Sequence, residues 1–497
     1  MSQDVTRREL IRAGGAGAVA LTVLGTSACD KDEATGAGPA RRSQAPAGAM
    51  NVVVVVMDSL RADHVYGRRA RTATMDAFAR ESLRFTQAYP EGMPTIPARR
   101  AIMSGRRTFP FRSWHPYKGL PPQPGWEPVG ADGEMFTEYL RGRGWTVGYV
   151  TDNPHLLHPV HKRFRARFDR VDLVEGQTPL LRKPKRRVSQ AEVDRHLPPS
   201  MRGSRAEPRM RAYLAANPRT RREEQFLAAR VFRRSMSWIE WARGHQPFAL
   251  VIDSFDAHEP WDAPRRIIDL YGARRGGGVE PIQPFPTPAA QYRELDLTRA
   301  LLRRMRQLYA AEVTLVDTWL GHFLDRLADL GLAQNTLVVL VSDHGVLLGE
   351  YGWVGKRYSE MHEELTHVPL MIRHPQGKGK GSASDYYAST HDIAPTVLSV
   401  LGQGVPDHMD GVDLSPLLDG TAPGARRTYR TSAYNTYVSA SDGRWLLISD
   451  NRGREKRLYA VHSEQANVAR RNPDPVQRLW RLIEKDAGPK GLPRFKN

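Results

Sequence analysis

The stretch that decides the fold is Asn51-Val52-Val53-Val54-Val55-Val56-Met57, which ends in Asp58-Ser59. Its apolar residues are consecutive, whereas a strand with one solvent-exposed face alternates apolar and polar residues. Such a run is typical of a strand buried on both faces of a parallel sheet. We therefore take this strand as the centre of the fold and ask what the rest of the chain places beside it.

Three further apolar runs have the same design, and each gives way to polar residues at its carboxyl end. They are Trp145–Val150, Phe248–Ile252 and Thr336–Val341, followed by Thr151-Asp152-Asn153, Asp253 to His258, and Ser342-Asp343-His344-Gly345. In open α/β sheets the ligand crevice lies outside the carboxyl ends of the strands. This pattern predicts that Asp58, Asp343, His344 and His258 gather in one place. The alternative is that the acidic residues only cap the helices that follow.

Amphipathic helical stretches separate these runs, over 74–82, 223–242 and 301–330. Strands alternating with helices predict an α/β fold, with a large mixed, mostly parallel central sheet between helical layers. We assign it to residues 51–425. Residues 163–222 are arginine-rich and punctuated by prolines, which predicts surface loops and short helices.

The last part of the chain, residues 426–497, has a different pattern. Short strand-like segments surround Asp442-Gly443, which is a hairpin signal, and Pro475 to Lys485 has the spacing of an amphipathic helix. We predict a small C-terminal subdomain with an antiparallel sheet and one helix packed on it.

The first 29 residues have the features of an export signal. Arg7-Arg8 precede an apolar run from Ala13 to Leu24, which resembles a twin-arginine signal peptide. Cys29 follows Thr26-Ser27-Ala28, so a lipoprotein cleavage box with a lipid anchor on Cys29 and simple cleavage after Ala28 are both open. Residues 30–50 have no apolar period and are expected to form a flexible linker. We expect export to the periplasm or cell envelope.

The charge balance indicates what kind of partner the protein attracts. The chain has 497 residues, with 73 Lys and Arg against 54 Asp and Glu, a formal charge of +19. An arginine-rich solvated surface is one interpretation, and attraction to sulfated, phosphorylated or membrane-surface substrates is the other. No zinc-finger spacing or RNA-binding aromatic signature accompanies the charge, so we predict no nucleic-acid partner.

A candidate nucleophile lies in Met93-Pro94-Thr95-Ile96-Pro97-Ala98-Arg99-Arg100. Pro97 suits a first helical position, and a short helix over 98–103 is expected to stop at Gly105. Thr95 would then sit just before a helix N-terminus, which favours an oxyanion or a developing alkoxide. With an arginine one turn on, its hydroxyl can attack phosphorus or sulfur. The alternative is an ordinary turn with a capping threonine.

Together these motifs resemble a sulfatase-type member of the alkaline phosphatase superfamily. The resemblance covers roughly residues 51–484 and rests on the number and order of the motifs. In chain order they are Asp58-Ser59-Leu60-Arg61-Ala62-Asp63-His64, Thr95-Ile96-Pro97-Ala98-Arg99, Asp256-Ala257-His258-Glu259-Pro260-Trp261, Ser342-Asp343-His344-Gly345 and Gly355-Lys356.

Two departures from the family pattern bear on the chemistry. Family sulfatases convert a cysteine or serine to formylglycine, but here the position is Thr95, and the single cysteine is Cys29. No cysteine-derived formylglycine can form, and unmodified threonine is the nucleophile of phosphodiesterase and phosphoethanolamine-transferase relatives. Sulfatases also carry a lysine and a histidine where this chain has Thr151-Asp152-Asn153-Pro154-His155. That change removes a cationic sulfate contact.

The resemblance implies a role for each site residue. One divalent metal ion (Ca²⁺, Mg²⁺, Mn²⁺ or Zn²⁺, which the sequence does not distinguish) would be bound by Asp58, Thr95, Asp343 and His344, with Ser59 at best a weak ligand. Thr95 would be the nucleophile, Arg99 and Lys356 would neutralise the ester oxygens, and His258 would contact the substrate or protonate the leaving group. A second metal at Asp253, Asp256, His258 or His391 is an alternative left open.

These roles predict an exported, metal-dependent hydrolase of sulfate or phosphate esters that works through a covalent intermediate on Thr95. Its substrate would be an anionic ester on a sulfated or phosphorylated small molecule, glycan or lipid. Two alternatives are a transferase that moves a phosphoryl-linked group onto a cell-envelope acceptor, and a non-catalytic binding protein that keeps the fold.

Overall fold

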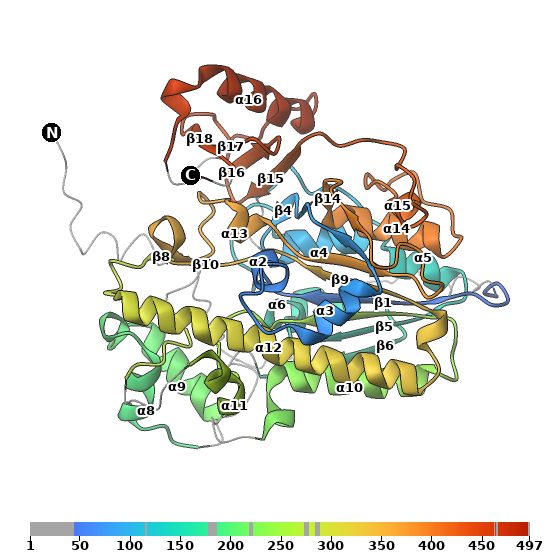
Figure 1. Cartoon of the computed structure of the whole chain (residues 1–497), viewed down its shortest axis with the longest axis horizontal. Coiled ribbons are helices and arrows are strands. Elements are labelled where there is room, and N and C mark those ends of the chain that lie inside the picture. The colour runs from blue at the N-terminus through green and yellow to red at the C-terminus, as the bar shows by residue number, and fades with distance from the viewer. Residues whose placement is uncertain are drawn as a thin grey trace, which may run out of the picture.

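The computed structural model describes residues 44–495, apart from 115–116, 177–185, 218–221, 273–277, 284–288, 462 and 464–465. Its centre is an eight-stranded sheet with the strand order β13-β2-β12-β9-β1-β7-β5-β6 (Figure 1). The predicted signal peptide, Cys29 and most of the predicted linker lie outside the described residues. None of the described helices is both long and apolar enough to span a membrane.

The predicted central strand is in the middle of this sheet. β1 (Asn51–Met57) pairs in parallel with β9 (Thr336–Ser342) on one side and β7 (Phe248–Ser254) on the other. All residues of these three strands are buried, which explains their unbroken apolar runs. β5 (Thr146–Thr151) and β6 (Arg170–Leu173) continue the parallel part to one edge.

The opposite edge of the sheet is mixed. β12 (Leu370–Arg373) is antiparallel to both β9 and β2 (Leu83–Phe85), and β13 (Ala383–Ser384) is parallel to β2. The predicted mixed, mostly parallel sheet is therefore confirmed. The prediction of only loops and short helices over 163–222 was wrong at β6, because this short strand is half-buried and carries no continuous apolar run.

Helices cover both faces of the sheet (Figure 1). Val53 and Val55 of β1 belong to the core that contains α10 (Leu227–Ala242) and α12 (Arg299–Asp329). Val52, Val54 and Val56 face the other core, with α4 (Thr95–Ser104), α5 (Phe136–Gly142) and α14 (Ile393–Val400). Successive side chains of a strand point to opposite faces, so one valine run supplies both cores.

A second, five-stranded sheet forms the C-terminal part, at the top of Figure 1. Its antiparallel strands are β15 (Arg430–Tyr434), β16 (Tyr437–Ser441), β17 (Trp445–Asp450) and β18 (Arg457–Ala460), with α16 (Pro473–Ala487) packed on them. The predicted antiparallel sheet with a helix is confirmed. The sequence did not indicate that β4 (Gly92–Met93) would join β15 in parallel, directly before α4.

Shorter elements connect these layers. They are α2 (Ala62–Val65), α3 (Ala73–Arg80), β3 (Ala88–Tyr89), α6 (Pro154–Leu157), α7 (Lys162–Arg165), α8 (Gln190–His196), α9 (Ala206–Ala216), α11 (Arg265–Ile268), β8 (Ala289–Gln291), β10 (Leu347–Leu348), β11 (Trp353–Gly355), α13 (Glu363–Thr366), β14 (Ala388–Ser389) and α15 (Ser415–Leu418).

Candidate active site and metal centre

Asp58, Asp343 and His344 meet at the carboxyl ends of β1 and β9. The register pairs Met57 with Ser342, so the residues that follow each strand are neighbours. One ligand atom of each side chain lies within 4.8 Å of the others, and all three residues are fully buried. The predicted convergence of these three residues is therefore present.

His344 Nε2 has no hydrogen-bond partner among the described residues, and Asp58 Oδ2 has none beyond its ion pair with Arg99 Nη1 at 3.1 Å. His344 Nδ1 lies 2.8 Å from the Gly345 carbonyl oxygen and donates to it, so the neutral ring keeps its lone pair on Nε2. Burial lowers the pKa of His344 to about 4, which keeps the ring neutral at pH 7. Two carboxylates and a neutral imidazole with a free lone pair on Nε2 fit a divalent cation.

The two carboxylates also need positive charge. Burial and the neighbouring Asp343 raise the pKa of Asp58 well above its usual value. Burial alone would raise the pKa of Asp343, but the charges of His344 and Arg99 outweigh burial and lower this pKa to about 2. Two carboxylates this close ionise together only where cations compensate them. A bound cation would meet that need.

Ser59 orients both metal-ligand candidates instead of acting as one of them. Its hydroxyl donates to Asp58 Oδ1 over 2.8 Å, and its backbone N–H donates to Asp343 Oδ1 over 3.0 Å. Ser59 has a φ of 59°, in the left-handed region that non-glycine residues seldom adopt. Tyr309 of α12 holds this turn, because its hydroxyl accepts from the Arg61 N–H (3.0 Å) and donates to the Ser59 carbonyl (2.8 Å).

Thr95 is the first residue of α4, and not the residue before the helix as predicted. Pro94 caps the helix, and Gly105 ends it in the left-handed conformation, as expected. Arg99 follows one turn later. Its Nη1 lies 3.3 Å from the Thr95 carbonyl oxygen and 3.1 Å from Asp58 Oδ2, and it also bonds Asp343 Oδ2. Thr95 and the two carboxylates thus surround one guanidinium nitrogen.

The rest of the Arg99 guanidinium is bound by Asp253. Arg99 Nε and Nη2 donate to the two Asp253 oxygens over 3.0 and 2.6 Å, and the Tyr149 hydroxyl donates to Asp253 Oδ2 over 2.6 Å. Arg99 is only 2% exposed, so its first effect is to neutralise carboxylates. The sequence assigned it only to the ester oxygens and gave no signal for this partnership.

A second metal centre at Asp253, Asp256, His258 and His391 is not formed. Asp256 accepts from the Ala228 N–H (2.8 Å), and His391 lies between Ser389 Oγ (3.0 Å) and Arg427 Nη2 (3.2 Å). Over the described residues, Asp58, Asp343 and His344 are the one group of acidic, histidine or cysteine side chains close enough to share an ion.

Lys356 and His258 form a pair on another side of the site. Lys356 Nζ lies 3.0 Å from His258 Nε2 and within 3.2 Å of both Glu259 carboxylate oxygens, while His258 Nδ1 donates to the Glu259 carbonyl over 2.7 Å. Burial and the Lys356 charge hold the pKa of His258 well below its usual value. Neutral His258 therefore accepts from Lys356 through Nε2, and Lys356 is the member of the pair that carries a proton to donate.

His155 is a site residue that sequence reasoning missed. Its ring packs edge-on against Phe255, which in turn stacks on His258. Burial, followed by the charges of Arg99, His161 and Lys356, lowers the pKa of His155 to about 3. The Asn153 side chain accepts from the His155 N–H (3.1 Å) and caps α6, so β5 leads directly into a turn that carries this histidine. The Asn-Pro pair before it was the available signal, because it is typical of a capped helix start.

Comparison with known proteins gives consistent matches. The family model described as Sulfatase matches residues 50–403. Choline-sulfatase of Rhizobium meliloti is 25% identical over 437 residues, which cover 81% of this chain and 78% of that protein. N-acetylglucosamine-6-O-sulfatase of Bacteroides thetaiotaomicron is 37% identical over 155 residues, but these cover only 30% of this chain and 27% of that protein.

Solved structures with a similar fold include two phosphonate monoester hydrolases. The protein from Silicibacter pomeroyi superposes with a TM-score of 0.66 at 20% identity, covering 88% of this chain and 95% of that one. The protein from Agrobacterium radiobacter gives a TM-score of 0.64 at 20% identity, covering 90% of this chain and all (100%) of that one.

Proposed function

This chain belongs to the sulfatase family and is a hydrolase of ester bonds. We propose that it is an exported, metal-dependent enzyme whose nucleophile is unmodified Thr95. Its substrates would be sulfate, phosphonate or phosphate esters of small molecules or glycans. The names of its relatives and structural neighbours, which include sulfatases and phosphonate monoester hydrolases, support this range. The twin-arginine sequence at its start supports export, and Cys29 could carry a lipid anchor.

The observation that carries this proposal is the geometry around Arg99 Nη1. The two buried carboxylates, Asp58 and Asp343, and the Thr95 carbonyl all lie on this one nitrogen. His344 adds an unpartnered Nε2 to the same cluster. Thr95 is the first residue of α4, and a hydroxyl at a helix N-terminus, on a residue that shares Arg99 with two carboxylates, can be activated as a nucleophile.

The residues divide the work as follows. A divalent cation held by Asp58, Asp343 and His344, with the Thr95 hydroxyl as a further ligand, would lower the pKa of that hydroxyl and bind an ester oxygen. Thr95 Oγ1 would release its proton to solvent water and form a bond to the sulfur or phosphorus atom as the bond to the leaving oxygen breaks. Lys356, held by His258 and Glu259, gives a proton to that oxygen. Water would then hydrolyse the threonine ester, which restores the Thr95 hydroxyl, and Lys356 would regain its proton from solvent.

Arg99 has two tasks in this scheme. It neutralises Asp253 and the carboxylates in the free enzyme, and its Nη1 is the part that faces the reacting group. Threonine cannot be converted to the aldehyde that formylglycine provides, so hydrolysis must proceed by breaking the Thr95 ester with water. This supports phosphoryl and phosphonyl esters alongside sulfate esters as substrates.

The test is a panel of aryl sulfates, phosphomonoesters, phosphonate monoesters and phosphodiesters, assayed before and after chelation and metal reconstitution. We expect turnover of at least one class, its loss on chelation and its return with one divalent metal. Asp343→Asn should lose both metal and turnover. Its matched control is Asp419→Asn, which removes an exposed carboxylate that pairs with Lys378. Full activity in chelated enzyme or in Asp343→Asn would contradict the proposal.

A further inference from the structure

The lysine segment, residues 356–366, begins at the proposed proton donor and is bound by the five-stranded C-terminal sheet. Tyr434 of β15 donates its hydroxyl hydrogen to the Lys356 backbone carbonyl over 3.1 Å. Arg457 of β18 donates to the Ser359 backbone carbonyl. The end of the chain therefore contacts the backbone of the residue that the proposed mechanism uses as an acid.

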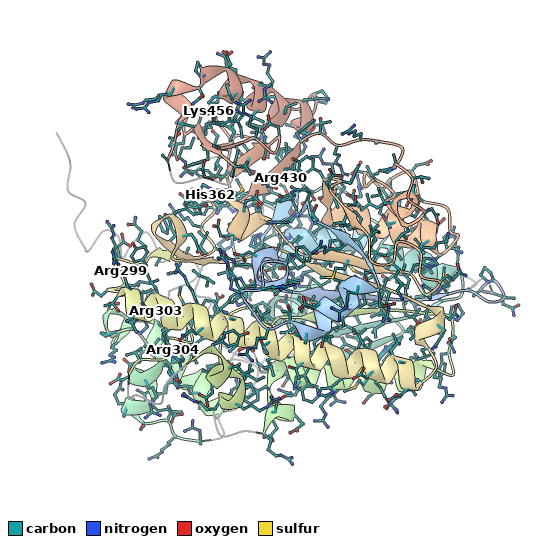
Figure 2. The ribbon with its side chains drawn as sticks, in the orientation of Figure 1. Arg299, Arg303, Arg304, His362, Arg430 and Lys456 are labelled. Atoms are coloured by element: carbon teal, nitrogen blue, oxygen red, sulfur yellow. The ribbon has the colours of Figure 1, made fainter. Side chains whose placement is uncertain are left out.

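Further contacts with the C-terminal sheet hold the far end of the lysine segment. The Tyr459 ring of β18 packs edge-on against His362, with 4.6 Å between the ring centroids. Arg430 of β15 donates to Thr366 Oγ1 over 3.2 Å and to the Glu363 carboxylate. Figure 2 shows Arg430 and His362 at this junction, between the C-terminal sheet and the central part of the molecule.

The same sheet holds the strand that leads to the nucleophile. β15 pairs in parallel with β4, so that Tyr434 lies beside Met93, two residues before Thr95. The Ala433 N–H also donates to the Glu91 carbonyl oxygen over 2.9 Å. Tyr434 thus binds the nucleophile strand through its backbone and the lysine segment through its hydroxyl.

A small hydrophobic core surrounds Tyr434. It contains Met93 of β4, together with Met361 and Leu365 of the lysine segment. Tyr434 belongs to this core and is 2% exposed. Burial raises the pKa of Tyr434, so its hydroxyl stays protonated and remains a donor to the Lys356 carbonyl. The packing therefore fixes the ring from which this hydrogen bond is made.

We propose that Tyr434 is a positioning residue that fixes the backbone of Lys356, so that the Lys356 ammonium group can protonate the leaving oxygen as its bond to sulfur or phosphorus breaks. This assignment rests on the proposed function. His258 and Glu259 hold the Lys356 side chain, whereas Tyr434 holds its backbone. A proton donor acts only within hydrogen-bond reach of its acceptor, and a misplacement of about 1 Å can cost about 10²-fold in rate.

The test is Tyr434→Phe, which removes only the hydroxyl oxygen. Two esters of the class that the enzyme hydrolyses are compared, a phenyl ester and a dinitrophenyl ester. Phenolate is a basic leaving group that needs a proton, whereas dinitrophenolate is stable as an anion and leaves without one. We expect the ratio of kcat for the phenyl ester to kcat for the dinitrophenyl ester to fall about tenfold or more. A merely structural loss would lower both rates together.

Tyr437→Phe is the matched control for this change. Tyr437 lies opposite Tyr434 on the neighbouring strand β16, and its hydroxyl donates to the Glu455 carboxylate. The ratio of the two rates in Tyr437→Phe should match that of the wild-type enzyme. Equal ratios in Tyr434→Phe and Tyr437→Phe would overturn the positioning role.

A double-mutant cycle tests whether the effect passes through Lys356. In Lys356→Ala the acid is gone, so adding Tyr434→Phe should change the ratio less than about twofold. The same fold-change in both backgrounds would overturn the proposal. A selective loss in Lys356→Ala without one in Tyr434→Phe would overturn it and leave the proposed function standing. An equal loss of both rates in Lys356→Ala would contradict the acid step of the proposed function, and the positioning role with it.

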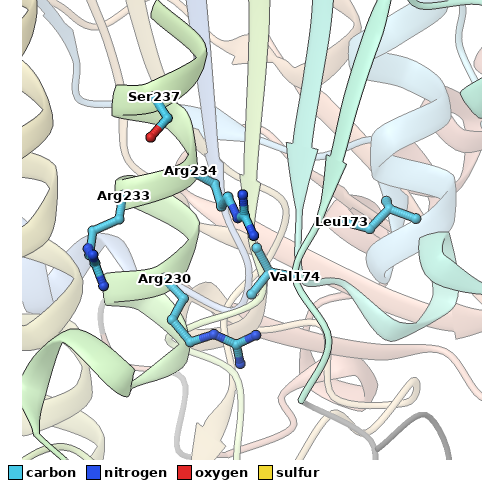
Figure 3. Close-up of a pocket in the computed structure, with 6 residues that line it drawn as sticks. All are labelled: Leu173, Val174, Arg230, Arg233, Arg234 and Ser237. Carbon is cyan, nitrogen blue, oxygen red and sulfur yellow. The ribbon is translucent and has the colours of Figure 1, made fainter. Parts of the chain in front are cut away.

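Arg457→Gln gives a second variant, which leaves the Tyr434 hydroxyl in place and should lower the same ratio. Its matched control is Arg234→Gln, which also removes one positive charge, from an exposed residue. Figure 3 shows Arg234 on α10, which lies at the opposite side of Figure 1 from the C-terminal sheet. An unchanged ratio in Arg457→Gln would contradict the role given to the C-terminal sheet, even if Tyr434→Phe gave no folded protein.

Hydrogen exchange separates this proposal from the proposed function, because it needs no turnover. The peptide spanning residues 356–366 should exchange faster in Tyr434→Phe and Arg457→Gln than in their two controls. If the wild-type enzyme cleaves no ester but exchange rises in these variants, the proposed chemistry fails, and the C-terminal sheet is still what holds Lys356. If exchange in this peptide is the same in all four variants, the positioning role fails whatever the activity.

Discussion

Tyr309→Phe tests whether α12 holds the metal-binding turn in place. The change removes one oxygen from a fully buried ring and leaves the ring contacts with His64 and Trp261 intact. It leaves the Arg61 N–H and the Ser59 carbonyl without their partner. A buried group that loses its hydrogen bond costs about 1–3 kcal/mol, so the two together should lower the free energy of unfolding by about 2–6 kcal/mol.

The same change should weaken metal binding, because Ser59 positions both Asp58 and Asp343. Loss of a residue that orients metal ligands typically reduces affinity about 10–100-fold. Urea unfolding of the metal-free protein gives the first quantity, and titration of the chelated protein with Mn²⁺ or Zn²⁺ gives the second.

A second tyrosine provides the control. The Tyr271 hydroxyl accepts from the Arg71 N–H over 2.7 Å and hydrogen-bonds the Thr314 hydroxyl over 2.6 Å. Thr314 is on α12, as Tyr309 is, but these contacts do not involve the Ser59 turn. Tyr271→Phe should lower stability while leaving metal affinity unchanged. If Tyr309→Phe changes stability by less than about 0.5 kcal/mol and binds metal like the wild type, the reasoning is refuted.

Three further results are expected. Thr95→Ser should retain turnover, because the hydroxyl remains, whereas Thr95→Ala should lose it by at least about 10³-fold with the fold intact; equal rates in the two variants, measured on the best panel substrate, would exclude Thr95 as nucleophile. Asp253→Asn should destabilise the protein by about 3–5 kcal/mol, because it leaves Arg99 buried with one fewer charged partner; an unchanged melting temperature would contradict this. Burial lowers the pKa of His391 to about 3. Below about pH 6.5 the unfolded chain therefore binds a proton on this histidine that the folded chain does not bind. Stability should therefore fall as pH drops from 6.5 toward 3, by up to about 1.4 kcal/mol per unit from this residue; a pH–stability slope that stays the same in His391→Gln would refute the assignment.

The parts of the fold that could be predicted are those with a local signal. The valine run of β1 predicted burial on both faces, and its two cores confirm this. Asp58 and Asp343 could be placed together because both follow buried parallel strands. The start of α4 was predicted wrongly. Pro97 suggested a helix that begins near residue 97, whereas the helix begins at Thr95 with Pro94 at its N-cap.

The missed features depend on contacts between distant parts of the chain. Arg99 and Asp253 are 154 residues apart, and no local pattern pairs them. β6 has four residues, three of them half-buried, so tertiary pairing with β5 creates it more than its own sequence does. β4 has two residues and joins a sheet whose other strands come from the end of the chain. Such partners are visible only once the chain is folded.

Mass mapping of a rapidly quenched reaction tests the central claim most directly. The metal-loaded enzyme is mixed with its best substrate, stopped in acid within the first turnover and digested to peptides. The account predicts that the peptide spanning residues 93–99 gains the mass of one SO₃ or HPO₃ group, or of the transferred ester, on Thr95, and that chelated enzyme does not gain it. An adduct on another residue, or steady turnover with Thr95 never modified, would contradict it.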